Sequence, residues 1–282
     1  MVENRPLLAF LSHLTLILGV VVIAFPVYIA IIASTHGPND FMSGVVPLLP
    51  GPHAFDNYWE MISTGISSSG VPPIGMMMVN SLVMALSIAI GKIAISIISA
   101  YAIVYFRFPF RAAAFWVIFI TLMLPVEVRI VPTFKVVADL GMLNSYAGLS
   151  IPLIASATAT FLFRQFFLTV PDELTEAARV DGAGPLKFFW DMLLPLSRTN
   201  IAALFVILFI YGWNQYLWPL MVVTDPAYYT IVMDIKRMAD VTDAVPQWNT
   251  VMATAVMALL PPVLVVIGMQ KLFVKGLVET EK

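Results

Sequence analysis

The sequence contains no cysteine, only three histidines and few charged residues. Without cysteine the chain forms no disulfide and offers no thiolate to a metal. The histidines, His13, His36 and His53, are scattered in sequence, which argues against a histidine-based metal centre. Charged residues make up 11% of the chain, against about 25% in an ordinary soluble domain. So little charge argues against a fold that is surrounded by water.

Apolar residues dominate what remains. They make up 60% of the chain, and the mean hydropathy is +0.91. A water-soluble core cannot hide this much apolar surface, so the bilayer must serve as the solvent. Leu7–Ala33 is too long for a signal-peptide core and has no convincing cleavage site, and we interpret it as an uncleaved first transmembrane helix.

We predict an all-α membrane protein with six transmembrane helices in a single domain, residues 1–282. The expected spans are about 7–33, 76–105, 112–132, 146–168, 200–223 and 250–269. The segment from His36 to Pro73 is rich in Gly, Pro, Ser and Asn and has no Lys or Arg. We expect an external loop there, with a short helix at Asp56–Ile62.

The distribution of Lys and Arg predicts that both termini lie in the cytoplasm. With that orientation most cations fall in inner segments, namely Arg5, Arg107, Arg111, Arg164, Arg179, Lys187, Arg198, Lys271, Lys275 and Lys282. The outer segments hold only Arg129, Lys135, Lys236 and Arg237. An excess of cations in cytoplasmic loops is the pattern that orients helical membrane proteins. The segment from Pro171 to Pro195 is therefore predicted to be cytoplasmic.

That segment, PDELTEAARVDGAGPLKFFWDMLLP, is the longest charge-bearing run in the chain. Pro171 suits the first turn of a helix, and the acids that follow it suit the positive end of the helix dipole. Gly182 offers a left-handed end to that helix, and Pro185 can start a second one, which Pro195 would end. The pattern predicts helix, glycine turn, helix. It fits a docking surface for another protein or an amphipathic loop that rests on lipid headgroups.

A family resemblance decides between these readings. Glu176-Ala177-Ala178, Gly182 and Leu194-Pro195 stand in the register of the EAA loop of ATP-binding-cassette importer permeases. Met192 stands where that pattern has Ile, which is a mild apolar change. Further stretches resemble the carbohydrate-uptake class, and more closely the permeases of sn-glycerol-3-phosphate importers: ENRP (3–6), NSL (80–82), AYAIVYFRFPFR (100–111), TLMLPVEVRI (121–130), SATATFLFRQFF (156–167) and FIYGWNQYLWPL (209–220).

The resemblance implies the type I importer (MetI-like) fold and a transport role without catalysis. In this family the EAA loop is a coupling helix that sits in a cleft of an ATPase subunit. Carried over, the contacts to the ATPase fall to Glu176, Ala177, Ala178, Asp181, Gly182, Leu194 and Pro195. The implied assembly has a second six-span permease, two ATP-binding subunits and an extracytoplasmic binding protein, in the bacterial inner membrane, with no nucleic acid. The implied cargo is sn-glycerol-3-phosphate or a related glycerophosphodiester, with a sugar as the alternative.

The sequence carries no nucleotide-binding loop of its own. The pattern G-x-x-x-x-G-K-[ST] does not occur, and the Gly91-Lys92 pair lies inside an expected span. ATP and Mg²⁺ would therefore be bound by the partner ATPase, and this chain would hold no cofactor.

Several polar residues are candidates for the translocation pathway. A cation in the middle of a span, such as Lys92, should face protein or water, because it costs about 2.5–3.5 kcal/mol on insertion scales. Lys92 therefore either meets an anionic cargo, or snorkels or pairs with a carboxylate of the partner permease. Asn214, Gln215 and Tyr216 belong to an aromatic-rich run that predicts an interfacial belt first and a cavity lining second. Glu127 and Arg129, near an outer helix end, are candidates for a gate or an interface ion pair.

Two other classes of protein fit the sequence less well. An ion-coupled secondary transporter usually carries a carboxylate deep within a span, and here only Glu127 lies near a span end. A passive membrane anchor would not need a turn glycine and a small-residue face in register. The outer loop from Asp225 to Asn249 carries charges of both signs, which suits either contact with a binding protein or a solvated connector.

Overall fold

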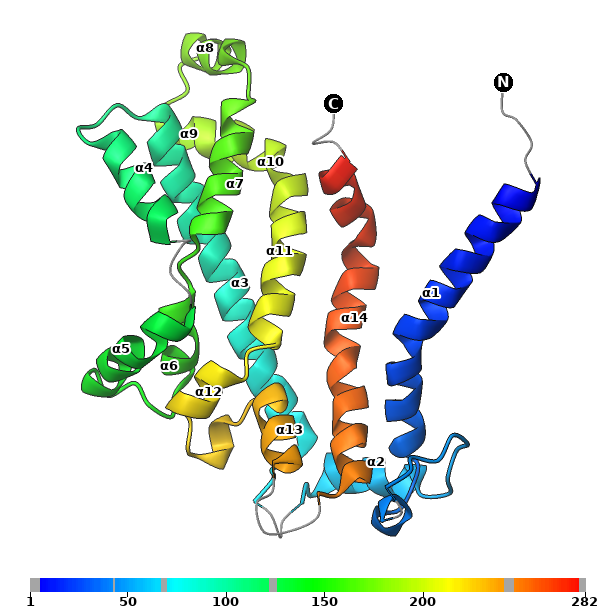
Figure 1. The fold of residues 1–282 in the computed structure, drawn as a ribbon. Coiled ribbons are helices and arrows are strands. Elements are labelled where there is room, and N and C mark those ends of the chain that lie inside the picture. The colour runs from blue at the N-terminus through cyan, green and yellow to red at the C-terminus, as the bar shows by residue number, and fades with distance from the viewer. Residues whose placement is uncertain (1–5, 43, 67–69, 122–125, 241–245, 279–282) are drawn as a thin grey trace. The chain divides into compact units, whose positions relative to one another are not determined.

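The computed structural model describes residues 6–42, 44–66, 70–121, 126–240 and 246–278, and every regular element in these ranges is a helix (Figure 1). The predicted all-α class is confirmed for these ranges. The chain forms two compact units. One contains residues 1–75 and 234–260, and the other contains residues 76–233 and 261–282.

The first unit contains α1 (Pro6–Ala33), α2 (Ala54–Ser63) and the first part of α14 (Trp248–Val278). Most α1 side chains are exposed although they are apolar, as expected for a helix that faces lipid. Both ends of α1 lie within one residue of the predicted first span. The predicted short helix at Asp56–Ile62 lies inside α2 and is also confirmed.

A buried amide holds this unit together. Asn57 on α2 donates to the carbonyl oxygens of Ser34 and His36, at 2.8 Å each. Its Oδ1 accepts a hydrogen bond of 2.8 Å from the Nδ2 of Asn249 at the start of α14. Because buried polar groups need such partners, this cluster fixes α2 to the end of α1 and the start of α14.

The second unit is built around α3 (Ile74–Tyr105), which packs on α7 (Ala157–Leu168) and α11 (Arg198–Trp213). A Cβ added at Gly91 of α3 would lie 2.7 Å from Cγ2 of Ile154. A Cβ added at Gly212 of α11 would lie 2.9 Å from the Cα of Ala85. Small residues let these helix backbones approach closely, as is common inside membranes.

Three described helices are long and apolar enough to cross a membrane: Phe10–Ala33, Ile74–Tyr105 and Trp248–Lys271. The count rises to five if each of two bent helix pairs is one span. The part of α14 that is apolar enough to cross a membrane, Trp248–Lys271, lies within two residues of the sixth predicted span at both ends, and the helix itself continues to Val278. Pro261 and Pro262 lie inside α14, and membrane helices tolerate such prolines when neighbouring groups satisfy the freed carbonyls.

The predicted third span, 112–132, is not one continuous helix among the described residues. α4 (Arg111–Ile120) ends before residues 122–125, which lie outside the described part of the chain, and α5 (Val126–Asp139) follows. Pro132 lies inside α5 rather than at its end. The helical segment continues past the predicted end of the span near residue 132, to Asp139.

The fourth predicted span has the correct ends but is bent by 47°. It consists of α6 (Tyr146–Ser150), a short 3₁₀ turn (Ile151–Leu153) and α7. Pro152 supplies no backbone N–H, which breaks the hydrogen-bond ladder at the bend. The Oγ of Ser156 then starts α7 by accepting from the backbone N–H of Ala159 at 3.3 Å.

The predicted fifth span, 200–223, is also divided. α11 ends at Trp213, and α12 (Leu217–Val222) starts after a break at residues 214–216. α12 packs on α6, where the indole N–H of Trp218 donates to the carbonyl oxygen of Gly148 at 3.0 Å. The apolar run in the sequence conceals this break because its residues are hydrophobic on both sides of it.

Side-chain amides organise the chain that follows α12. The Oδ1 of Asn144 accepts from the backbone N–H groups of Thr224 and Asp225, at 2.7 and 2.9 Å. The Nδ2 of Asn80 donates to the carbonyl oxygens of Ala227 and Tyr229, at 2.9 and 3.0 Å. These bonds hold the approach to α13 (Ile231–Ala239) against the start of α3 and the start of α6.

Candidate functional site

The Pro171–Pro195 segment forms the predicted helix, turn and helix. α8 (Asp172–Val180) follows Pro171, whose backbone is extended at φ −60° and ψ 139°. Asp172 and Glu173 occupy its first turn and Arg179 its last turn. This order of charges is favourable at both ends of the helix dipole. Figure 1 shows α8 beyond the end of α7, at the opposite end of α3 from α12.

Gly182 makes the turn that ends α8. Its φ is +71°, in the left-handed region that side chains with a Cβ rarely adopt. The N–H of Ala183 bonds to the carbonyl of Ala178 at 2.8 Å, and the N–H of Gly182 bonds to that of Arg179 at 3.0 Å. These bonds satisfy carbonyls at the helix end. No neighbouring atom of the described residues lies within 4 Å of a Cβ added at Gly182, so the backbone conformation is what requires glycine there.

Two buried aromatic residues anchor the second helical segment to α3. α9 (Pro185–Phe188) continues into a π-helical turn at Phe189–Leu193. Phe188 and Phe189 are buried, with their rings 5.4 Å from that of Tyr105 and 5.1 Å from that of Tyr101, respectively. The Tyr101 hydroxyl also donates to the carbonyl of Pro185 at 2.8 Å. The segment is thus fixed to the end of the longest helix in its unit.

The other side of the segment is exposed and mixes apolar with acidic side chains. Val180, Leu186 and Trp190 are 87%, 74% and 61% exposed. Glu176 is exposed and makes no ion pair with any residue that the structure describes. Apolar residues that are exposed beside charges are typical of a surface that another protein covers.

The other residues of the EAA motif differ in how exposed they are. Ala177, Asp181 and Gly182 are exposed, whereas Ala178 is 4% exposed and packs within this chain. Of the predicted small-residue pair, only Ala177 is therefore free to meet a partner. Leu194 and Pro195 are half-buried.

The prediction that the second helix ends at Pro195 is correct to within one residue. The helical run from Pro185 ends with α10 (Leu194–Leu196), and a bend of 70° then leads into α11. The π-helical turn before Pro195 widens the backbone, which makes room for a residue that cannot donate a hydrogen bond. The Pro171–Pro195 segment is consequently joined to α11 by helix on both sides of the bend.

A second set of polar residues lies inside the same unit, around Lys92. Lys92 is 7% exposed, and its Nζ lies 3.7 Å from the centroid of the Tyr211 ring. Arg129 is close enough to act electrostatically on both side chains. Neither cation pairs with a carboxylate among the residues whose side chains are described. The cluster therefore carries positive charge that an anion can balance.

The residues Asn214, Gln215 and Tyr216 fall at the break between α11 and α12. Gln215 is half-buried and its Nε2 donates to the carbonyl of Tyr211 at 3.1 Å. Asn214 and Tyr216 are exposed. The predicted aromatic belt is not formed by the tryptophans of this run, because Trp213 and Trp218 are 2% and 3% exposed.

Tyr211 is the residue that the sequence reasoning overlooked. It lies one helical turn before Gln215 in the same polar run, and this i, i+4 spacing was the available signal. Glu127 lies in α5, but its side chain is outside the described part of the chain, so its suggested pairing with Arg129 stays a prediction.

The bent helices around α3 and the helix-turn-helix at one end of it define the class: a polytopic helical transport permease. Residues 92–279 match the family described as "Binding-protein-dependent transport system inner membrane component", and the chain belongs to that family.

The chain is similar over its full length to named relatives. It is 60% identical over 282 residues to the sn-glycerol-3-phosphate transport system permease protein UgpE of Agrobacterium fabrum, with 100% of both chains covered. It is 58% identical to UgpE of Brucella melitensis and 55% identical to UgpE of Yersinia pestis, again over 282 residues and with full coverage of both chains. The expected resemblance to glycerol-3-phosphate permeases is confirmed.

A solved structure shares the fold. A chain of a bacterial ABC transporter involved in the import of the acidic polysaccharide alginate superposes with a TM-score of 0.80 at 20% identity, covering 96% of this chain and 98% of that one. At this identity the likeness bears on the fold alone, and it supports the predicted type I permease fold.

Proposed function

We propose that this chain is one of two transmembrane permeases of an ABC importer for sn-glycerol-3-phosphate. It would form half of the translocation pathway and catalyse no reaction itself. The observation that carries the proposal is the arrangement of the Pro171–Pro195 segment, which we call the coupling segment. Its buried side is fixed to α3 by Phe188 and Phe189, while its exposed side presents Glu176, Val180 and Leu186.

This arrangement suits the transmission of a movement. A force applied to the exposed side of α8 would be transmitted to α3 through the aromatic contacts of Phe188 and Phe189. It would be transmitted to α11 through the helical connection at Leu194–Leu196. Because packed helices move as rigid bodies, a displacement of the segment would tilt both helices together. We assign the source of this force to a partner ATPase that binds ATP and Mg²⁺, since the sequence has no phosphate-binding loop.

The proposed topology has six spans, with both termini in the cytoplasm and the whole chain acting as one permease domain. α4 and α5 would together make the third span, α6 and α7 the fourth, and α11 and α12 the fifth. The distribution of Lys and Arg supports this orientation, which places α8 in the cytoplasm. The membrane would be the bacterial inner membrane.

The cargo assignment rests on the relatives and on charge. Glycerol-3-phosphate is an anion, and Lys92 and Arg129 carry positive charge that described carboxylates do not balance. Arginine and lysine are the usual partners of phosphate groups in proteins. Asn214, Gln215 and Tyr216 would line the pathway at the helix break. The other proposed components are a second permease, two ATPase subunits and an extracytoplasmic binding protein.

Reconstitution tests the proposal. Proteoliposomes that contain this chain, the second permease, the ATPase and the binding protein should accumulate radiolabelled glycerol-3-phosphate only when ATP is inside. Excess unlabelled glycerol-3-phosphate should abolish uptake of the label, and excess sugar should not. Competition by a sugar instead would reassign the cargo, and ATP-independent uptake would reject an importer of this class.

A further inference from the structure

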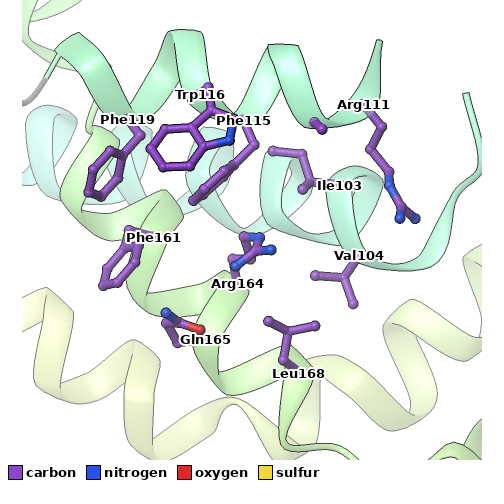
Figure 2. A pocket seen from close by; sticks show the side chains of 11 residues that line it. Ile103, Val104, Arg111, Phe115, Trp116, Phe119, Phe161, Arg164, Gln165 and Leu168 are labelled. Carbon is purple, nitrogen blue, oxygen red and sulfur yellow. The ribbon is translucent and has the colours of Figure 1, made fainter. Parts of the chain in front are cut away.

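A pocket of about 420 Å³ lies between α3, α4 and α7, apart from the Lys92 cluster and the exposed side of α8. Figure 2 shows Arg164 reaching from α7 towards α4, with Arg111 at the start of α4. Phe115 and Trp116 form part of the wall on α4, and Gln165 lies beside Arg164 on α7. All the lining residues belong to one compact unit.

The position of Arg164 is set by stacking rather than by charge pairing. Its guanidinium carbon lies 4.2 Å from the centroid of the Phe115 ring. Its Nε is buried and has no hydrogen-bond partner among the residues that the structure describes, although a buried N–H normally has one. The stacked face fixes the plane of the guanidinium and leaves its edge available for a planar or tetrahedral oxyanion.

Arg111 adds a second cation to the same pocket. Its only hydrogen bond among the described residues is a long one of 3.4 Å, from Nη1 to the carbonyl of Phe106, so most of its donors are available. Neither arginine forms an ion pair with a described carboxylate. Two arginines on one pocket, neither with a described acidic partner, suit an anion with several oxygens, such as a phosphate.

The apolar surroundings of the pocket favour a phosphate that belongs to a lipid over one that belongs to a small soluble anion. Trp116 and Ile120 of α4 are 57% and 54% exposed, and Leu168 at the end of α7 is 54% exposed. A small soluble anion would make no use of this apolar margin, whereas the chains of a lipid would cover it. Basic pockets between transmembrane helices at the cytoplasmic side are typical sites for anionic lipid headgroups.

We propose that this pocket binds the headgroup phosphate of an anionic phospholipid between Arg111 and Arg164, with the acyl chains along the exposed side of α4. This proposal rests on the proposed function only for the orientation of the chain in the membrane, which places the pocket in the cytoplasmic leaflet. Because α7 leads directly into α8, a lipid that joins α4 to α7 would stiffen the support of the coupling segment.

The test uses the purified full-length chain in mixed micelles, with phosphatidylglycerol as the anionic lipid and phosphatidylcholine as the neutral control. Lipid that stays bound through gel filtration is extracted and quantified by mass spectrometry. The wild-type chain should retain phosphatidylglycerol in preference to phosphatidylcholine. Arg111→Gln with Arg164→Gln should lower that retention at least about tenfold, because even one charge-assisted contact accounts for such a factor. Arg107→Gln, a nearby cation outside the pocket, should leave it unchanged.

The design separates binding from folding and from transport. If the double variant elutes as an aggregate, Arg111→Gln alone carries the test, because Arg111 is exposed and its loss leaves no cavity. If the Arg111→Gln variant retained as much phosphatidylglycerol as the wild-type chain, the proposal would be overturned. Displacement of phosphatidylglycerol by millimolar inorganic phosphate or glycerol-3-phosphate would also overturn it, in favour of a soluble anion. Lipid retention and its displacement are both measured without the partner subunits. A negative result in these measurements can therefore be told apart from a negative result in the uptake assay.

Discussion

The Nζ atom of Lys92 lies 3.7 Å from the centroid of the Tyr211 ring, which joins α3 to α11 inside one unit. A desolvated cation–π contact of this kind contributes about 2 kcal/mol. This contact explains how a lysine that is 7% exposed is held without a described carboxylate partner. It also leaves the positive charge uncompensated, which suits a pathway for an anion.

Replacement of Lys92 by methionine should impair uptake of glycerol-3-phosphate. The change keeps the length and the apolar stem of the side chain and removes the charge, so the KM for uptake should rise about tenfold or more. Lys135→Met is the matched control, because Lys135 is exposed and paired with Asp139 at 3.6 Å. Uptake by the Lys92 variant with unchanged KM and rate, in an importer that assembles normally, would remove Lys92 from the pathway.

Gly182→Ala should uncouple ATP hydrolysis from transport. Alanine at a φ of +71° costs about 1–2 kcal/mol, so the turn would shift and re-aim α8. Gly184→Ala provides the control, because Gly184 has a φ of −70° and the space beside it is equally open. We expect uptake to fall severalfold only in the Gly182 variant, measured beside ATPase activity. Equal uptake in both variants would count against the backbone argument.

Glu176→Gln should weaken binding of the ATPase subunit. The exposed carboxylate of Glu176 lacks a described ion-pair partner, and a charge-assisted bond to the ATPase is worth about 1.5–3 kcal/mol. Co-purification of the ATPase should therefore fall about tenfold or more. Glu173 lies one turn earlier in the same helix, and Glu173→Gln should reduce co-purification of the ATPase less. The coupling role of Glu176 would be rejected if the two variants retained the ATPase equally.

Asp234 on α13 should make the stability of the protein depend on pH. Burial raises the pKa of its carboxyl from 3.8 to about 6, against the opposing effect of Arg237. The folded protein therefore holds this proton more tightly than the unfolded chain, and the associated stability is lost as pH rises from about 4 through about 6. The penalty above that range is at most about 3 kcal/mol.

The measurement is thermal unfolding of the detergent-solubilised chain at pH 5 and pH 8. Asp234→Asn should reduce the difference in Tm between the two pH values and raise the Tm at pH 8. The Oδ2 of Asp234 has no hydrogen-bond partner among the described residues, so the amide replaces it without breaking a described bond there. Asp240→Asn, at an exposed pair with Lys236, should leave the difference unchanged. An unaltered difference in the Asp234 variant would contradict the shifted pKa.

Local chemistry in the sequence determined the coupling segment. The left-handed turn at Gly182 and the helix start at Pro185 follow from the backbone freedom of glycine and the fixed φ of proline, which act over a few residues. The continuous apolar runs likewise located α1 and α3 to within two residues of their ends. Such features depend on neighbours in the chain, so they can be predicted from the sequence alone.

Tertiary structure alone decided what each polar side chain meets. Ala178 turned out to be buried within the chain while Ala177 is free, and Tyr211 provided the partner of Lys92 from a helix more than 100 residues away in sequence. The break after α11 was likewise hidden, because hydropathy is the same on both sides of it. Composition records how much apolar surface must be buried, whereas contacts between distant helices determine which charges remain without a partner.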